Sequence, residues 1–326
     1  MQPKLFDVQE AQKKKKDNEN LYVVSVFFNP QQSKARDSHL TEFIPYIKYS
    51  GAELFLVEIV FGNADFKFTK PHDPMSLRLR TETELWHKER GLNLGIQKLI
   101  EHIPDCKYIA TIDADIVHSN SRWVKDTVNA LQRFCVVQTF SEAQNLNPKG
   151  ERQWSCPSVL KQYHNIGYHQ HPAISLSQIG NGHPGLSWAW RRETLEQLGG
   201  LIDICTAGSG DTHMANALCE EPDFNYRDKM SAGFKKSLVL WAERCNLYVK
   251  GNVGYVDGVC MHKWHGRPSE RGYSARWDIV CFHQYDPATD LVTCLNGLYR
   301  FSHHKPKLAS DIRRSLNSRN DDGTDE

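Results

Sequence analysis

The chain has 326 residues, of which 40% are hydrophobic and 24% charged, a composition typical of a globular protein that buries a full core. Lys and Arg total 40 against 39 Asp and Glu, so the charge balance favours no particular class of charged partner. No apolar run of about 18 residues is present, and the first twenty residues lack the apolar stretch of a signal peptide. The nine cysteines form no Cys-x-x-Cys pair, which favours reduced thiols. We therefore expect a cytoplasmic protein without a membrane span.

Two polar segments flank the region that is expected to fold. Residues 1–20 include four consecutive lysines at positions 13–16, a pattern typical of a solvated, disordered arm. The alternative for these lysines is contact with DNA or a membrane surface. Residues 301–326 form a charged tail that we also expect to be disordered. The region between them, residues 21–300, is predicted to be one domain.

Residues 21–140 alternate between apolar runs and segments with helical spacing. Strands are expected at 21–28, 53–60, 107–112 and 135–140, and helices at 35–49, 81–102 and 124–134. This alternation predicts an α/β fold, in which helices cover a parallel sheet. Residues 141–183 are polar and rich in His, Gln and Pro, which favours a long loop, and helical spacing returns over 185–217.

Polar residues stand at or near the carboxyl ends of three predicted strands. Asn29 follows the first strand, Glu58 lies near the end of the second, and Asp113 comes directly after the third. Ligands bind beyond these ends in open α/β sheets. We therefore expect the three side chains to converge on one crevice.

The sequence Asp113-Ala114-Asp115 is the pattern that most strongly indicates chemistry. Two residues apart in an extended chain, both carboxylates point to the same side, where they repel each other unless a cation lies between them. Mg²⁺ and Mn²⁺ favour such oxygen ligands. Asp-x-Asp also occurs in surface turns, but its place directly after a buried strand favours a metal site.

Together with the preceding Ile-Ala-Thr-Ile (109–112), this stretch resembles the Asp-x-Asp strand of GT-A glycosyltransferases. The resemblance implies a Rossmann-like, mainly parallel sheet with flanking helices, a nucleotide-sugar-binding half (21–140) and an acceptor-binding half (141–300). It implies that Asp113 faces the donor ribose and sugar. It further implies that Asp115 binds the cation, Mn²⁺ or Mg²⁺, that offsets charge on the leaving diphosphate.

Other segments extend the resemblance on the donor side. Residues 86–96 are similar to the Lys/Arg, Asn and Gly segment that opens the helix before the Asp-x-Asp strand, and Glu58 occupies the place of an acidic residue that binds the base. The donor-binding residues implied in this way are Phe28, Asn29, Glu58, Lys88, Arg90, Asn93 and Asp113. A solvated helix face is the alternative for Lys88 and Arg90.

The second half of the chain resembles polypeptide N-acetylgalactosaminyltransferases. Residues 185–203, with Trp188, match their acceptor side, and Gly208-Ser209-Gly210-Asp211 follows where the family often has Gly-Glu-Asp or Gly-Gly-Glu. The resemblance implies that Asp211 is the general base of an inverting reaction. The alternative is that Asp211 caps a helix predicted at 212–218.

Two histidines follow late in the chain, in Met-His-Lys-Trp-His-Gly (261–266). GT-A enzymes that use a histidine ligand place it in this region, which implies that His262 or His265 binds the cation together with Asp115. We favour His265 because Gly266 leaves room beside it. A mixed carboxylate and imidazole site suits Mn²⁺ better than Ca²⁺.

These patterns predict an inverting glycosyltransferase that moves a sugar from a UDP-sugar to a hydroxyl acceptor with Mn²⁺. The acceptor stays open between a hydroxymethylated pyrimidine in DNA, as in a phage-infected bacterium, a glycan and a protein. One alternative is a sugar-phosphate nucleotidyltransferase, although residues 29–34 lack the glycine-rich loop expected of it. Another is a non-catalytic binding protein on the same scaffold.

Overall fold

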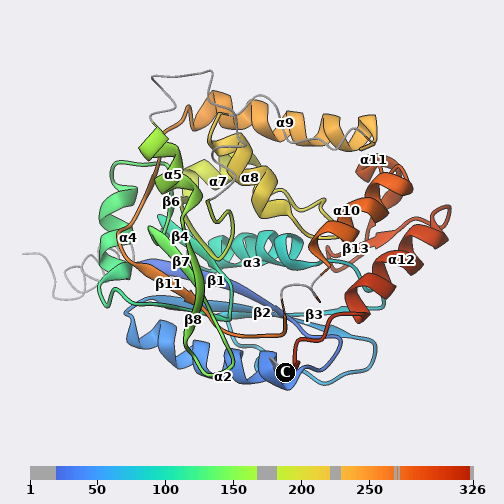
Figure 1. The fold of residues 1–326 in the computed structure, drawn as a ribbon, viewed down its shortest axis with the longest axis horizontal. Helices are drawn as coiled ribbons and strands as arrows, with labels where there is room; N and C mark the ends of the chain where they lie inside the picture. The colour runs from blue at the N-terminus through green and yellow to red at the C-terminus, as the bar shows by residue number, and fades with distance from the viewer. Residues whose placement is uncertain (1–19, 167–181, 221–228, 268–269, 271, 324–326) are drawn as a thin grey trace, which may run out of the picture.

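The computed structural model describes residues 20–166, 182–220, 229–267, 270 and 272–323. A seven-stranded sheet with the order β10-β6-β9-β4-β1-β2-β3 lies at its centre (Figure 1). The strands are β1 (Leu21–Phe28), β2 (Glu53–Phe61), β3 (Ser76–Thr81), β4 (Tyr108–Ile112), β6 (Val136–Gln138), β9 (Ser187–Arg191) and β10 (Val253–Tyr255). Only β9 runs antiparallel to its neighbours in this sheet. The predicted fold class, α/β with a mainly parallel sheet and flanking helices, is confirmed.

Helices cover both faces of this sheet. Figure 1 shows α2 (Lys34–Tyr49) and α3 (Lys88–His102) on opposite sides of it, and two separate hydrophobic clusters correspond to these sides. Successive strand residues point to opposite faces, so Val23 joins the cluster of α2 whereas Val24 joins that of α3. The continuous apolar run of β1 therefore follows from burial on both faces. Helix α4 (Trp123–Leu131) contributes to the same cluster as α2, and α7 (Arg192–Leu198), α8 (Gly210–Leu218) and α9 (Ala232–Tyr248) contribute to that of α3.

A second sheet brings distant parts of the chain to the end of β4. It has the order β5-β11-β7-β8 and consists of β5 (Ile116–His118), β7 (Glu142–Leu146), β8 (Arg152–Pro157) and β11 (Val259–His262). In its register His262 lies opposite Ile116 on one side and Asn145 on the other. Asp115, which immediately precedes β5, is therefore placed beside His262.

Two predicted segments differ from the structure. The helix expected over 81–102 begins only at Lys88, because Thr81 is the last residue of β3 and residues 82–87 form a loop. The alternating leucines and arginines of β3 suit an edge strand. The long loop expected over 141–183 is wrong where the structure describes it, since β7, β8 and α5 (Val159–Ile166) lie there. Strand β8 is largely exposed, so it lacks the apolar pattern of a core strand. Residues 167–181 lie outside the described residues.

The disorder expected over 301–326 is also wrong for residues 301–323. The chain there continues from β13 (Tyr299–Phe301), paired with β12 (Leu291–Thr293), into α12 (Pro306–Asn317). Helix α12 buries Leu308, Ile312 and Leu316, an i, i+4, i+8 stripe within a charged sequence. Helices α10 (Tyr273–Phe282) and α11 (Pro287–Asp290) precede it. The expected arm at residues 1–19 lies outside the described residues, and no described helix is both long and apolar enough to cross a membrane.

Close packing of α3 on the sheet gives a stability prediction. A Cβ atom at Gly95 would lie 2.5 Å from Val57 Cγ2 and 2.9 Å from Val24 Cγ1. Gly95→Ala should therefore lower the free energy of unfolding by about 1–3 kcal/mol, as overpacking does, despite the roughly 1 kcal/mol that alanine adds to an ordinary helix position. Urea unfolding measures the change, with Lys98→Ala on the exposed face of α3 as the control. A stabilised Gly95→Ala protein would contradict the packing described here.

Candidate functional site

A cavity of about 440 Å³ opens at the carboxyl ends of β1 and β4. Seven of the residues that the sequence predicts for the site line it, namely Phe28, Lys88, Asp113, Asp115, Asp211, His262 and His265. They come from five parts of the chain, so the cavity exists only in the folded protein. A volume of this size is that of a small-molecule binding site.

Asp115, His262 and His265 form a compact triad in this cavity. Asp115 Oδ2 lies 3.4 Å from His262 Nε2 and 3.3 Å from His265 Nε2. The two Nε2 atoms are only 3.1 Å apart. One ligand atom from each of the three residues falls within 4.8 Å of the others, as a shared cation requires.

The outer nitrogens of both imidazoles face acceptors, which orients the rings. His262 Nδ1 lies 2.9 Å from Asn145 Oδ1, and His265 Nδ1 lies 3.5 Å from Asp321 Oδ1. Imidazoles that donate Nδ1–H in this way present unprotonated Nε2 atoms, as metal-binding histidines do. Asp115 Oδ1 is buried and has no hydrogen-bond partner among the described residues. The triad therefore fits a divalent cation with mixed nitrogen and oxygen ligands, for which Mn²⁺ is suited.

The electrostatics of Asp115 agree with this arrangement. Although burial opposes it, the neighbouring His262 and His265 hold the pKa of the Asp115 carboxyl well below its usual range. This effect requires positive charge on the imidazoles, so the Asp115 carboxylate stabilises a positive charge at this point, either a proton or a bound cation.

Asp113 and Lys88 form an ion pair beside the triad. Lys88, the first residue of α3, places its Nζ 2.6 Å from Asp113 Oδ1, and each side chain is about a quarter exposed, at 27% and 26%. Burial and the carboxylate of Asp115 raise the pKa of Asp113, against the opposing effect of Lys88. For Lys88, the carboxylates of Asp113, Glu89 and Asp211 outweigh the effect of burial and raise the pKa of the amine. Lys88 is thus a permanent cation of the cavity.

Asp211 is the second residue of α8, so the N-cap role considered for it is wrong. The N-cap is Ser209, whose φ of 71° lies in the left-handed region. Asp211 Oδ1 accepts a hydrogen bond from Thr212 N at 2.8 Å, and Oδ2 lies against Gly185. The side chain lines the cavity with its second oxygen not engaged in this bond.

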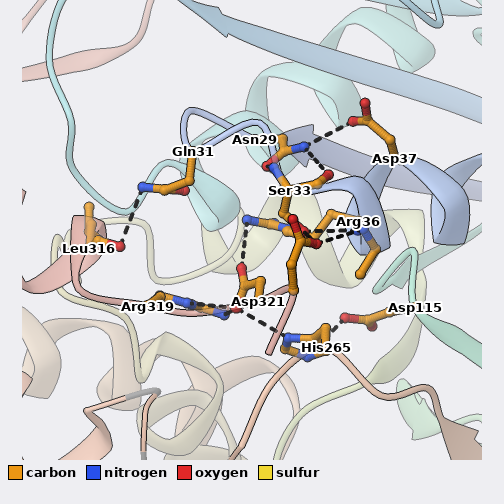
Figure 2. A network of polar contacts seen from close by, with 12 residues as sticks. Asn29, Gln31, Ser33, Arg36, Asp37, Asp115, His265, Leu316, Arg319 and Asp321 are labelled. Carbon is orange, nitrogen blue, oxygen red and sulfur yellow. Dashed lines mark hydrogen bonds and ion pairs between the residues drawn. The ribbon is translucent and has the colours of Figure 1, made fainter. Parts of the chain in front are cut away.

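Two residues at strand ends do not converge on the cavity as expected. The amide of Asn29 binds within its own turn, donating to Ser33 O and Asp37 Oδ1 (Figure 2). Glu58 is 2% exposed, and its carboxylate accepts hydrogen bonds from the backbone N–H groups of residues 67–69 and from Thr69 Oγ1. Glu58 therefore fixes the loop after β2, and the prediction that it binds the nucleobase does not fit the structure.

Arg90 and Asn93 also lie away from the cavity. Both donate to Asp203 Oδ2 at 3.0 Å, because positions three apart share one face of α3 and this face turns towards the loop after α7. Trp188 is buried in β9, where its indole N–H donates to Pro184 O and its ring stacks on Trp190. These three predicted contacts are structural in the folded chain.

Several cavity residues were not anticipated from the sequence. Trp86 has two guanidinium groups near its ring, with Arg276 Cζ 5.6 Å and Arg319 Cζ 5.7 Å from the ring centroid. On β8, Trp154 stacks on His183 at 6.3 Å. Trp86 is the first residue of the segment 86–96 that led to Lys88, so its position was a usable signal. The other four reach the cavity through tertiary packing that no local pattern indicates.

Glu89 is a further carboxyl group that the sequence analysis missed. It is 4% exposed and lines the cavity beside Lys88. Burial raises its pKa to about 7, with Lys88 opposing the shift and Asp211 adding to it. A carboxyl with this pKa exchanges its proton near neutral pH.

Comparisons with known proteins give only distant likenesses. No protein-family model matches the chain, and no curated protein matches it in sequence. It is similar to a mutant of the Drosophila β1,4-galactosyltransferase 7 in complex with manganese, UDP-Gal and xylobiose, with 15% identity, a TM-score of 0.33 and 62% of each chain covered. The chain thus spans less than two thirds of that protein.

Two further solved structures show the same level of likeness. Mannosyl-3-phosphoglycerate synthase from Rubrobacter xylanophilus has 10% identity and a TM-score of 0.39, covering 89% of this chain and 86% of the other. The 4-diphosphocytidyl-2C-methyl-D-erythritol synthase from Anaerococcus prevotii has 9% identity and a TM-score of 0.33, covering 74% and 88%. Likeness at this level is one of fold and carries no argument about the activity of this chain.

The pKa of Glu89 predicts how stability depends on pH. The folded protein holds a proton on Glu89 up to about pH 7, whereas in the unfolded chain the pKa is 4.5, so stability falls as pH rises through this window. Glu89→Gln abolishes this loss. The free energy of unfolding of the variant, relative to that of the wild type, should therefore rise by up to about 3 kcal/mol from pH 5 to pH 8. Urea unfolding at both pH values measures the gain, and Glu101→Gln on the exposed face of α3 is the control. An equal effect of Glu89→Gln at both pH values would exclude the raised pKa.

Proposed function

We propose that this protein is a metal-dependent, inverting glycosyltransferase of the GT-A kind that uses a UDP-sugar donor. The triad of Asp115, His262 and His265 carries the proposal, because it offers a cation site inside a cavity at the carboxyl end of β4. In open α/β sheets this is where ligands bind. The resemblance of residues 109–115 to the Asp-x-Asp strand supports the same reading.

The cavity has the charges and the surfaces that a nucleotide-sugar donor needs. The cation, when bound, supplies a Lewis acid for the leaving diphosphate. Lys88 adds a fixed positive charge, and it holds Asp113 through one oxygen, which leaves the other oxygen to accept a hydroxyl of the donor. Phe28 and Trp86 provide aromatic surface in the same cavity for a base.

Asp211 is the proposed general base. Its Oδ1 accepts from Thr212 N in the first turn of α8, and its Oδ2 lies against Gly185. The remaining oxygen accepts the proton of an acceptor hydroxyl, whose oxygen attacks the anomeric carbon from the face opposite the diphosphate. Attack from that face inverts the anomeric centre.

The acceptor side of the cavity carries an aromatic surface. Trp154 is 40% exposed and stacks on His183, which suits contact with the flat face of a sugar ring or a base. We therefore keep a glycan and a hydroxymethylated pyrimidine in DNA as the proposed acceptor classes, met in the cytoplasm.

Binding of UDP tests the metal and the donor together. Calorimetry of the wild type should show UDP binding with Mn²⁺ that disappears with EDTA, and Asp115→Ala should remove the dependence on Mn²⁺ because it removes the carboxylate ligand. Asp211→Asn is the matched control, since this pocket carboxylate lies outside the triad and should leave the dependence intact. UDP binding that is equally tight in EDTA would contradict the proposal.

Transfer itself tests Asp211. With a panel of UDP-sugars and acceptors, Asp211→Asn should lower turnover by about 10²–10⁴-fold, the usual effect of losing a general base, while Mn²⁺-dependent UDP binding and the melting temperature stay at wild-type values. NMR of the product should show an inverted anomeric centre. Near-normal turnover of the variant, or a retained configuration, would refute the assignment.

A further inference from the structure

Asp321 reaches the triad from the opposite end of the chain, in residues 318–323, here called the C-terminal segment. Figure 2 shows its carboxylate between Arg36, Arg319 and His265, with His265 directed towards Asp115. Asp321 is 5% exposed, so its charge needs partners. Arg319 Nη2 lies 3.1 Å from Oδ1, and Arg36 Nη1 lies 3.7 Å from Oδ2.

The C-terminal segment is fastened on both sides of the triad. On one side, Asp322 caps the start of α2, accepting from Ser33 Oγ at 2.7 Å and from Ala35 N at 2.8 Å. On the other side, Trp264 Nε1 donates to Gly323 O at 2.8 Å. At Gly266, which has a φ of 84°, a Cβ atom would lie 2.1 Å from Asn320 O, so the segment rests on the backbone directly after His265.

The two histidines of the triad differ in their outer partners. The amide oxygen of Asn145 serves His262, whereas the carboxylate of Asp321 lies 3.5 Å from His265 Nδ1, at the long end of hydrogen-bond distances. A carboxylate behind a metal-binding imidazole fixes its tautomer and ring orientation and makes its other nitrogen a stronger ligand. The guanidinium groups of Arg36 and Arg319 hold the carboxylate in this place.

We propose that Asp321 is a positioning residue of the metal site, so that the C-terminal segment completes the cation-binding triad from outside it. The inference rests on the metal site of the proposed function. The inference has two consequences that do not follow from the triad alone. His265 binds the cation only weakly without the carboxylate of Asp321, and the C-terminal segment is fixed more firmly when the cation is bound, since the coupling is reciprocal.

The test is calorimetric titration of the full chain with Mn²⁺ alone. Loss of such an outer partner costs about 10–100-fold in metal affinity, so we expect that loss for Asp321→Ala and a smaller one for Asp321→Asn, which keeps an oxygen towards His265. Asp322→Asn is the matched control, because Asn keeps an oxygen that accepts from Ser33 Oγ and Ala35 N, so the segment stays docked while a neighbouring charge is lost and the Mn²⁺ affinity should stay unchanged. Melting temperatures in EDTA separate stability from metal binding, and electron spin echo spectra of bound Mn²⁺ report imidazole ligation.

The outcomes distinguish the inference from the proposed function. If Asp321→Ala binds Mn²⁺ as tightly as the wild type, the role of Asp321 is refuted and the metal site stands. If Asp322→Asn weakens Mn²⁺ binding as much as Asp321→Ala does, the negative charge of the segment and not the carboxylate behind His265 is responsible, which also refutes the role of Asp321. If the wild type does not bind Mn²⁺, the metal site of the proposed function fails and the inference fails with it. Should Asp321→Ala not fold, Asp321→Asn decides in its place.

Discussion

The approach of two imidazole nitrogens to one carboxylate constrains the site more than any other contact. His262 Nε2 and His265 Nε2 are 3.1 Å apart and both lie within 3.4 Å of Asp115 Oδ2. Two lone pairs and a carboxylate at this distance repel one another unless a positive charge lies among them. The fold therefore has to hold three groups together that are stable as neighbours only with a cation or a shared proton. Such preorganisation suits the proposed binding of a diphosphate beside a cation.

The two sheets provide this constraint. The large sheet delivers Asp113 and Asp115 at the end of β4, and the small sheet brings β11 alongside β5, so that His262 stands opposite Ile116. A hydrogen bond from Lys263 N to Asp115 O continues this pairing beyond the last strand residue. Helix α3 then presents Lys88 from the other side. Each of these side chains is positioned by backbone pairing or by a helix terminus, and none depends on a long surface loop.

The sequence allowed the parts with local signals to be predicted. Strands β1, β2 and β4 are buried on both faces, and their apolar runs gave their positions to within one residue. Residues 86–96 were less informative, because Lys88 faces the cavity whereas Arg90 pairs with Asp203. The sequence does not show which face of α3 turns towards the cavity. Asn29 and Glu58 stand at the expected strand ends, but their side chains form hydrogen bonds with the residues that follow these strands.

The contribution of residues 301–323 to the fold and to the site could not be predicted from the sequence, for a different reason. The buried apolar residues of α12 are few and stand four apart among charged residues. The role of Asp321 depends on its contact with His265, 56 positions away in the sequence. Charged residues that look solvated in the sequence are paired here, as Asp321 is with Arg36 of α2. Long-range ion pairs of this kind leave no periodic signal.

Anomalous diffraction from crystals soaked with Mn²⁺ and UDP is the most direct measurement of the central claim. The account predicts a single strong manganese peak within bonding distance of a carboxylate oxygen of Asp115 and of Nε2 of both His262 and His265, with the diphosphate on its open side. A peak elsewhere in the molecule, or well-defined UDP in the cavity with no manganese at the triad, would contradict it.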